Sequence, residues 1–523
     1  MKKILKYTFV GLMGCSVLTS CLDSALDTAP TDSMSGTTLL SNANSALIPL
    51  NGIYRSMYTS WSPTDNTHQS FGINSYTIMA DVMGEDMIMD DMGSGWYWYD
   101  CLYNVKSRYT SSAWRSYDMW NCYYTWISNA NYILAAQETM SGTTEDVNYV
   151  IGQAYAIRAY SYFMLAQNFA RTYKGHEEDP CCPIYTEPTV AGTAGQPRST
   201  VQKVYELITS DIQTAINKLT DAPEQKYKTH IDLSVAYGIQ ARIALTMEDW
   251  NLAKTAAHNA IEASGCTVLP VSDFLGLNDV TAANVMWGAP IQNDQTGMYA
   301  SFFSHMDAVD ELDVSQKPYY GNSARKQINK DLYDNIMLPT DTRKQWWDPT
   351  NEESERGADA GYQQEKFKFS DYSTWLGDYI WMRVEEMYLT AAEAECMLGD
   401  ETAAKNDLYA VMSKRVDGYT TSKTGTALGA TSSQRTGSLR EEIIDQRRIE
   451  LWGEYGRIWD LRRLHQGFRR TVAQGWPDAA LLSNRPTDDA ECYMWVLTIP
   501  QSEFDGNVNM DLSKDQNPTG DYK

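Results

Sequence analysis

The chain has 523 residues, and 43% of them are hydrophobic, which is enough for a substantial globular core. The formal net charge is −24 and the pI is near 4.7. An acidic surface repels phosphate groups, which argues against nucleic acid or an anionic lipid surface as the partner and favours a neutral ligand.

The first twenty residues have the order of an export signal. Three lysines among the first six residues precede an apolar run over residues 7–18, which is too short to span a bilayer. The run ends in Leu18-Thr19-Ser20-Cys21, which looks like a bacterial lipobox, where the cysteine carries the lipid after cleavage. The alternative is an ordinary cleaved signal followed by a chance cysteine. We predict a lipoprotein signal peptide over 1–20 and a lipid anchor on Cys21, with no other membrane-inserted segment.

The remaining cysteines do not predict a disulfide framework. Seven are left after Cys15 is cleaved off and Cys21 is lipidated, and an odd number cannot pair completely within one chain. No CxxC pair occurs, so a structural metal site is not expected. We interpret these thiols as small buried apolar side chains.

Helical periodicity dominates after a flexible tether at 21–41, which is rich in Asp, Ser, Thr and Gly. Apolar residues recur on one helix face over 153–171, and Ser199 or Thr200 predicts the start of a helix that runs to about Leu219. Small residues at 236–260 are spaced as in a tetratricopeptide helix pair, and a similar run returns at 391–408. We therefore expect a mainly α fold over 42–523, with interrupted helix pairs.

Three irregular stretches interrupt the helical pattern. The largest, at about 265–377, is rich in Asp, Asn, Gly, Pro and aromatic residues, and shorter ones lie at 81–100 and 418–438. Long loops on a rigid helical scaffold usually carry function.

Four separated segments share features of one protein family. They are the lipobox with the residues that follow it to Pro30; the helix Ala154 to Phe169 with its alanines, Arg158 and aromatics; Arg383 to Ala394 with its sequel Arg447 to Arg463; and the tail from Ile499-Pro500 to Asn517-Pro518. Together they resemble the SusD/RagB family of nutrient-binding outer-membrane lipoproteins. Gln446, where an acid is common, and Trp452, in place of a smaller apolar residue, depart from the pattern.

The resemblance implies a tetratricopeptide-like scaffold whose loop-rich face binds nutrient, usually a glycan, at the cell surface. It also implies a SusC-like TonB-dependent transporter as partner, and a location on the outer membrane facing the medium. RagB-like members imply a peptide ligand as the alternative. A helical glycoside hydrolase and a purely structural lid for the transporter are further alternatives, and we expect no enzyme activity.

Charged residues alternate in sign at helical spacing between Arg447 and Arg463. The spacing predicts three ion pairs, namely Arg447–Glu450, Glu454–Arg457 and Asp460–Arg463. A hydrolase would use Glu454 and Asp460 as its two carboxylates, but neighbouring arginines would keep both ionised, and neither could then act as the acid. We interpret the cluster as a structural motif.

Aromatic residues are the candidate ligand contacts, because the apolar faces of sugar rings stack on indole and phenol rings. The run Trp96-Tyr97-Trp98-Tyr99 follows two glycines in an acidic stretch, and as a strand it would send Trp96 and Trp98 to one face. Our candidates for ligand binding are Trp96, Trp98, Tyr320, Trp347 and Trp375. Core packing is the alternative role for each of them.

Motifs of other chemistry are missing from the sequence. It has no GxSxG, P-loop or HExxH, and its six histidines have no metal-ligand spacing. Residues 292–297 have some features of a structural calcium loop but lack its regular acidic ligands and terminal Glu. We expect no cofactor and no catalytic residues.

Overall fold

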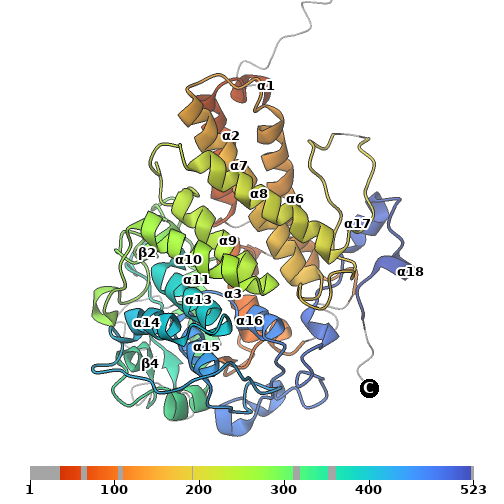
Figure 1. Cartoon of the computed structure of the whole chain (residues 1–523). Coiled ribbons are helices and arrows are strands. Elements are labelled where there is room, and N and C mark those ends of the chain that lie inside the picture. The colour runs from red at the N-terminus through yellow and green to blue at the C-terminus, as the bar shows by residue number, and fades with distance from the viewer. Residues whose placement is uncertain are drawn as a thin grey trace, which may run out of the picture.

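The computed structural model describes residues 36–59, 67–103, 110–190, 192–309, 318–350 and 361–519, and most of its regular structure is helical (Figure 1). The predicted signal peptide, Cys21 and the predicted tether up to residue 35 lie outside these residues. Residues 36–41 were predicted as tether, but Gly36–Leu39 forms the short helix α1, and the Ser45 hydroxyl donates to the Leu39 carbonyl at 2.6 Å. The folded body therefore begins before residue 42. No helix in these ranges is long and apolar enough to cross a membrane.

Four long helices form the upper part of the molecule in Figure 1. They are α2 (Ala43–Ser56), α6 (Trp114–Ala135), α7 (Thr144–Phe169) and α8 (Val201–Leu219), and α7 packs against each of the other three. The Thr200 side chain caps α8 by accepting a backbone hydrogen bond, which confirms the predicted start of this helix. The helix ends at Leu219, which confirms the predicted end. Arg158 on α7 donates two hydrogen bonds to Asp211 on α8, at 2.7 and 2.8 Å, and so fixes how the two helices are aligned.

Two helix pairs continue the scaffold below α7 and α8. They are α9 (Leu233–Met247) with α10 (Trp250–Ser264), and α13 (Val384–Met397) with α14 (Glu401–Met412), followed by α15 (Leu439–Glu450) and α16 (Arg457–Arg463). α10 packs on α13 although the large insert separates them in sequence. The small residues Ala253, Ala257 and Ala260 of α10 are fully buried. They allow the close helix packing that the sequence predicts, so the helix-pair scaffold is confirmed.

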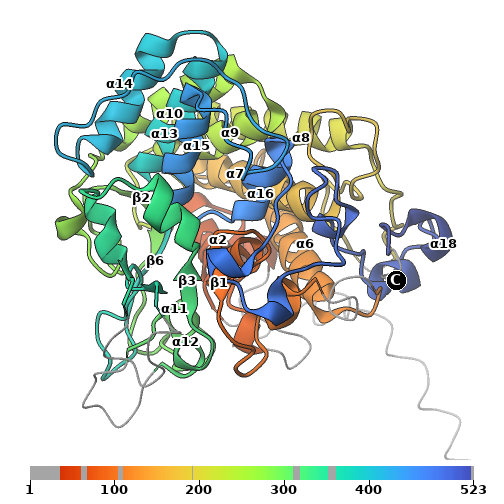
Figure 2. The same cartoon turned by 90° about the horizontal axis from the view of Figure 1, so that it is seen from below.

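The large insert supplies most of the strands. β1 (Met87–Met89), β3 (Lys326–Ile328), β5 (Gln363–Gln364) and β4 (Trp347–Asp348) form an antiparallel sheet in the order β1-β3-β5-β4, and β2 (Val285–Ala289) pairs antiparallel with β6 (Tyr379–Arg383). Met87 lies opposite Ile328, so this pairing ties the N-terminal part of the chain to the insert. Figure 2 shows β1 and β3 beside α11 (Phe302–Met306) and α12 (Tyr319–Ser323), on the side away from α14.

The remaining helices and turns are short. They are the helices α3 (Ile73–Val82), α4 (Trp98–Cys101), α17 (Gln501–Gly506) and α18 (Leu512–Asp515); the 3-10 turns η1 (Thr67–Gln69), η2 (Val271–Asp273), η4 (Thr342–Trp346), η6 (Val472–Gln474), η7 (Asp478–Ala480) and η8 (Tyr493–Trp495); and the π-helical turn η3 (Leu332–Ile336). The strand considered for 96–99 is wrong, because Trp98 begins α4. Gly93 and Gly95, with φ of 49° and 87°, turn the chain just before it.

The segment 447–463 is largely buried, and its charged side chains are in ion pairs except Arg462, which donates to backbone carbonyls, as expected for a structural motif. Arg463 donates to Asp460 at 2.7 Å, which confirms one of the three predicted pairs. Arg447 pairs with Asp460 at 2.9 Å and not with Glu450. The predicted Glu454–Arg457 pair is also wrong: α15 ends at Glu450 and α16 begins at Arg457, so Glu454 is not on a helix with Arg457.

Glu450 is instead the centre of a fully buried ionic network. Its carboxylate lies 2.8 Å from Arg415, 3.1 Å from Arg383 and 3.3 Å from Arg343, and these arginines lower the pKa of Glu450 well below its ordinary value. Glu454 extends the network by accepting from Arg383 at 2.7 Å. The network joins α15 to β6 and to the chain after α14.

Candidate functional site

Aromatic side chains from four segments meet on the loop-rich side of the molecule. The aromatic cluster, as we call it, consists of His68 in η1, Trp96 before α4, Tyr299 in the insert, and Tyr319 and Tyr320 in α12. The pairing of β1 with β3 places the chain around Trp96 next to the chain around Tyr320, which explains why residues so distant in sequence meet.

The rings of the cluster form a stepped surface that faces solvent. His68 and Trp96 stack with centroids 5.2 Å apart and planes 2° from parallel, and Tyr320 meets Trp96 edge-on at 6.1 Å. Tyr299 lies 6.0 Å from Tyr320 and 5.8 Å from Tyr319. Tyr299 is 45% exposed and Tyr319 50% exposed, whereas Tyr320 is only 6% exposed and forms the floor. Large exposed rings grouped in this way are typical of a binding surface.

A buried histidine supports the floor of the cluster. The His305 ring stacks on Tyr320 at 4.7 Å, and its Nε2 donates to the His68 carbonyl at 2.6 Å. Burial holds the pKa of His305 well below its ordinary value, so the ring is neutral at physiological pH. The Tyr320 hydroxyl is hydrogen-bonded to Nδ1 of His68. These contacts fix Tyr320 and His68 before any ligand arrives.

A second aromatic group is joined to the first through α11. Trp375 packs 5.2 Å from Phe369, and Phe369 packs 5.5 Å from Phe303, which lies two residues before His305 on this helix. Asp307 follows α11 and accepts hydrogen bonds from the Phe369 N–H and the Tyr372 hydroxyl, both at 2.8 Å. α11 therefore fixes the position of the two aromatic groups relative to each other.

The five predicted ligand-binding residues lie in different surroundings in the structure. It brings Trp96 and Tyr320 together in the cluster, and it leaves Trp375 half-buried in the second group. Trp98 and Trp347 are 7% and 2% exposed, so neither offers a ring face to a ligand. For Trp347 the register of β4 on β5 is the cause, because it turns the ring into the core against Trp452, at 5.7 Å.

Sequence reasoning missed His68 and Tyr299. His68 carries no local signal, since it lies in a polar stretch without periodicity. Tyr299 follows the Asn- and Gly-containing segment 292–297 of the insert, so its place in a loop was the available signal.

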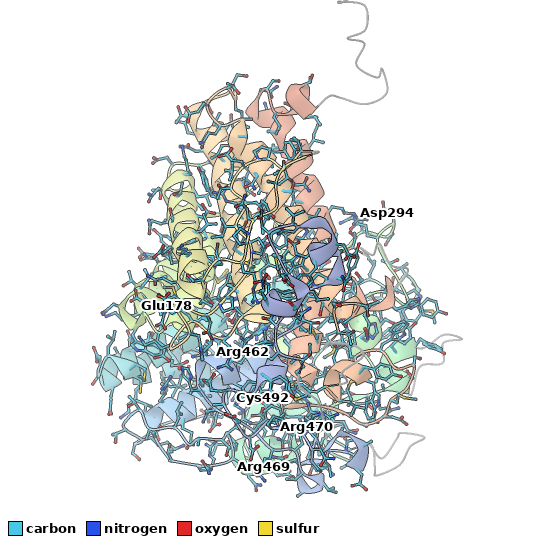
Figure 3. All side chains as sticks on the ribbon, turned by 90° about the vertical axis from the view of Figure 1, so that its right-hand side faces the viewer. Glu178, Asp294, Arg462, Arg469, Arg470 and Cys492 are labelled. Carbon is cyan, nitrogen blue, oxygen red and sulfur yellow. The ribbon has the colours of Figure 1, made fainter. Side chains whose placement is uncertain are left out.

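The segment 292–297, considered above as a calcium loop, offers one carboxylate, Asp294, which lies at the outer edge of the molecule in Figure 3, far from the buried Arg462. One carboxylate is too few for a calcium site.

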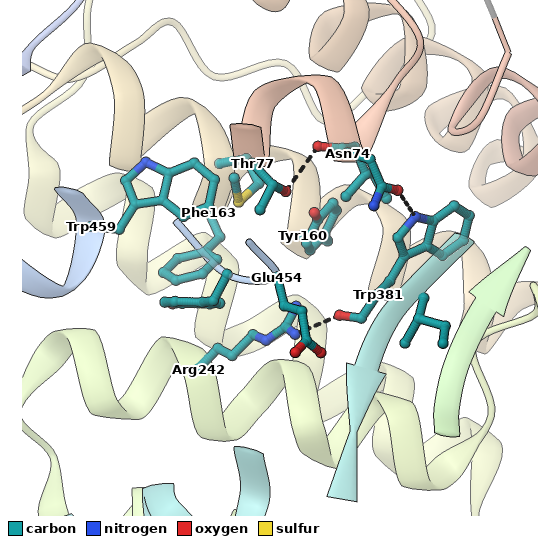
Figure 4. A pocket seen from close by; sticks show the side chains of 12 residues that line it. Asn74, Thr77, Tyr160, Phe163, Arg242, Trp381, Glu454 and Trp459 are labelled. Atoms are coloured by element: carbon teal, nitrogen blue, oxygen red, sulfur yellow. Dashed lines mark hydrogen bonds between the residues drawn. The ribbon is translucent and has the colours of Figure 1, made fainter. Parts of the chain in front are cut away.

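Two of the hollows among the described residues are alternative ligand sites to the cluster. The cavity in Figure 4, between Asn74, Tyr160, Arg242 and Trp381, has a volume of about 20 Å³, which is room for a water molecule and not for a sugar. A groove of about 1030 Å³ lies between α2 and α6. Its lining is mainly aliphatic, and its one aromatic ring, Tyr132, already donates its hydroxyl to the Thr189 carbonyl. Neither matches the stacking surface that a sugar ring requires.

The carboxylates considered for hydrolysis are held ionised. Asp460 lies between Arg447 and Arg463, and these arginines lower its pKa to about 2. Arg383 and Lys366 lower the pKa of Glu454. A general acid must carry a proton at the working pH, so this pair cannot perform the reaction considered for it.

Two family models match most of the chain. The model described as "Starch-binding associating with outer membrane" matches residues 23–245, and the model described as "SusD family" matches residues 305–519. The chain belongs to the SusD/RagB family. The predicted resemblance and the mainly α fold are thereby confirmed.

Individual relatives agree with this assignment. A SusD-like protein, P38 of Formosa agariphila, is 25% identical over 264 residues, which is 50% of this chain and 46% of the relative, so the match spans about half of that protein. A SusD-like carbohydrate binding protein from Bacteroides vulgatus has a TM-score of 0.72 at 23% identity, with 90% of this chain and 97% of that chain covered. Surface glycan-binding protein A from Bacteroides thetaiotaomicron has a TM-score of 0.66 at 16% identity, with 92% and 100% covered. At these identities the two structures show the shared SusD fold.

Proposed function

We propose that this SusD/RagB protein binds a glycan on the aromatic cluster. The observation that carries the proposal is the group of solvent-facing rings of Trp96, Tyr299 and Tyr319 above a floor of Tyr320. Sugar rings stack their C–H faces on such rings. Among the described residues the Tyr299 and Tyr319 hydroxyls have no hydrogen-bond partner, and both side chains are exposed, so they are available to sugar hydroxyls. The printed names of two structural neighbours, a carbohydrate binding protein and a surface glycan-binding protein, support the same ligand class.

The size of the cluster favours weak binding. Two or three stacked rings at about 0.5–1.5 kcal/mol each, with a few exchanged hydrogen bonds, correspond to dissociation constants from about millimolar to micromolar. Weak binding suits a protein that releases its ligand to another. We propose that lipid on Cys21 anchors the protein to the outer membrane, facing the medium, and that the glycan passes to a SusC-like TonB-dependent transporter.

The test is affinity electrophoresis of the double variant Trp96→Ala/Tyr299→Ala against a panel of polysaccharides. We expect the wild type to be retarded by at least one glycan and the variant to lose this retardation. Tyr409→Ala is the matched control, since Tyr409 is 54% exposed on α14 and lies outside the cluster. Unchanged retardation of the double variant on the preferred glycan contradicts the proposal.

Two further measurements separate the alternatives. Calorimetry against glycan and peptide mixtures distinguishes the ligand classes, and heat from peptides alone would favour a RagB-like peptide binder. A reducing-end assay after incubation with the bound glycan would reveal hydrolysis. We expect heat with glycans and no new reducing ends.

A further inference from the structure

Three helices of the scaffold bring a histidine and two carboxylates together, away from the aromatic cluster. His258 lies on α10, Glu395 on α13 and Asp407 on α14, and Figure 1 shows these helices packed side by side. Nε2 of His258 lies 2.7 Å from an Asp407 oxygen and 3.5 Å from a Glu395 oxygen. One ligand atom from each residue lies within 4.8 Å of the other two. A single imidazole nitrogen therefore faces two carboxylates.

The Glu395 side chain is only partly satisfied inside this group. Glu395 is 3% exposed, and its Oε2 has no hydrogen-bond partner. A buried carboxylate with an unpartnered oxygen is costly unless a cation compensates it. His258 is the ion-pair partner of both acids, and neither contact involves a donor to Glu395 Oε2.

We propose that His258, Glu395 and Asp407 bind a first-row divalent metal ion of the Zn²⁺ type, with solvent in the remaining position. Zinc bonds to nitrogen and oxygen of about 2.0–2.1 Å in a tetrahedron place neighbouring ligand atoms about 3.3 Å apart. The two distances from Nε2, 2.7 and 3.5 Å, lie on either side of this value, so small side-chain shifts admit the ion. An imidazole ligand favours zinc, nickel or cobalt over calcium and magnesium, which take oxygen ligands.

The site would join the two halves of the scaffold. α10 ends just before the large insert and α13 begins just after it, so an ion held by His258 and Glu395 connects the helix pairs on either side of the insert. Because the ion binds only the folded chain, it raises the unfolding temperature.

The test is calorimetry of ZnCl₂ into the untagged, chelator-treated protein, together with visible absorption of bound Co²⁺ and thermal unfolding with and without Zn²⁺. We expect one equivalent of Zn²⁺ to bind, a Co²⁺ spectrum of low coordination number and a higher unfolding temperature. His258→Ala should weaken binding by at least about 100-fold, since even residues behind a metal ligand contribute about 10- to 100-fold. His258 has a 45% exposed side chain, so this variant should fold.

His465→Ala is the matched control. The side chain of His465 is 36% exposed and also lies near two carboxylates, but Glu248 faces its Nε2 at 3.6 Å and Glu491 faces its Nδ1 at 3.5 Å, so no single nitrogen is shared. We expect this variant to keep the zinc affinity of the wild type. The proposal is overturned if the wild type binds no Zn²⁺ with saturation, if His258→Ala binds as tightly as the wild type, or if His465→Ala loses binding to the same extent.

Discussion

Replacing Asp307 by Asn should change how the stability of the protein depends on pH. Asp307 is 1% exposed, and burial raises its pKa from 3.8 to about 7. Its Oδ2 accepts both hydrogen bonds, from Phe369 N–H and Tyr372 hydroxyl, and an Asn carbonyl oxygen can accept the same two. Asp307→Asn therefore keeps the contacts and removes the titration.

The size of the effect follows from the two pKa values. The folded state binds the Asp307 proton more tightly than the unfolded state does, so its stabilising contribution is fully present below about pH 4 and is lost as pH rises through about 7. With 1.36 kcal/mol per pKa unit, the loss between pH 5 and pH 8 is about 2–3 kcal/mol. Other groups titrate equally in both proteins and cancel in the difference.

Urea unfolding followed by tryptophan fluorescence at several pH values measures this difference. Relative to the wild type, Asp307→Asn should gain about 2–3 kcal/mol of unfolding free energy between pH 5 and pH 8. Asp371→Asn is the control in the same segment: hydrogen bonds from Ser373 and Thr374 lower the pKa of Asp371, so its contribution is lost only as pH falls below about 4 and stays constant over this range. A difference for Asp307→Asn that does not change with pH refutes the reasoning.

Two other substitutions test the scaffold. Glu450→Gln leaves Arg343, Arg383 and Arg415 without their shared carboxylate and should cost about 3–5 kcal/mol in urea unfolding. Glu401 forms an ion pair with Lys405, 3.8 Å away on the surface, and accepts from the Gly425 N–H at 2.7 Å, a bond that a Gln oxygen can also accept. Glu401→Gln should therefore cost at most about 1 kcal/mol, and equal losses would contradict the assignment. Gly321→Ala would place a Cβ 1.7 Å from the Asp307 carbonyl oxygen, so we expect displacement of α12, a loss of about 1–3 kcal/mol in thermal unfolding and weaker glycan binding. Gly506→Ala meets nothing within 4 Å, and a similar loss there would show that the crowding at Gly321 is not the cause.

The helical scaffold could be predicted because its signals are local. Periodicity of 3.6 residues marked the helix pairs, and Thr200 marked the start of α8. The ion pair between Asp460 and Arg463 was also found from spacing, since both lie on α16. The partners of Glu450 could not be found in this way, because Arg343, Arg383 and Arg415 come from segments that only the tertiary fold brings to α15.

The aromatic cluster depends on pairings that the sequence does not show. Trp347 and Trp375 lie in similar loop-like surroundings, and only the register of β4 on β5 turns Trp347 into the core. Trp96 and Tyr320 were both candidates, yet their contact requires the pairing of β1 with β3. His68 lacks any local pattern, so its stacking on Trp96 is visible only in the fold.

The central claim is that glycan binds on the aromatic cluster, and a structure of the protein with an oligosaccharide selected from a glycan array tests it most directly. We predict a sugar ring in van der Waals contact with Trp96 and Tyr299, with its hydroxyls hydrogen-bonded to Tyr299 or Tyr319. An oligosaccharide bound in the groove between α2 and α6, or anywhere without contact to these rings, would contradict the account.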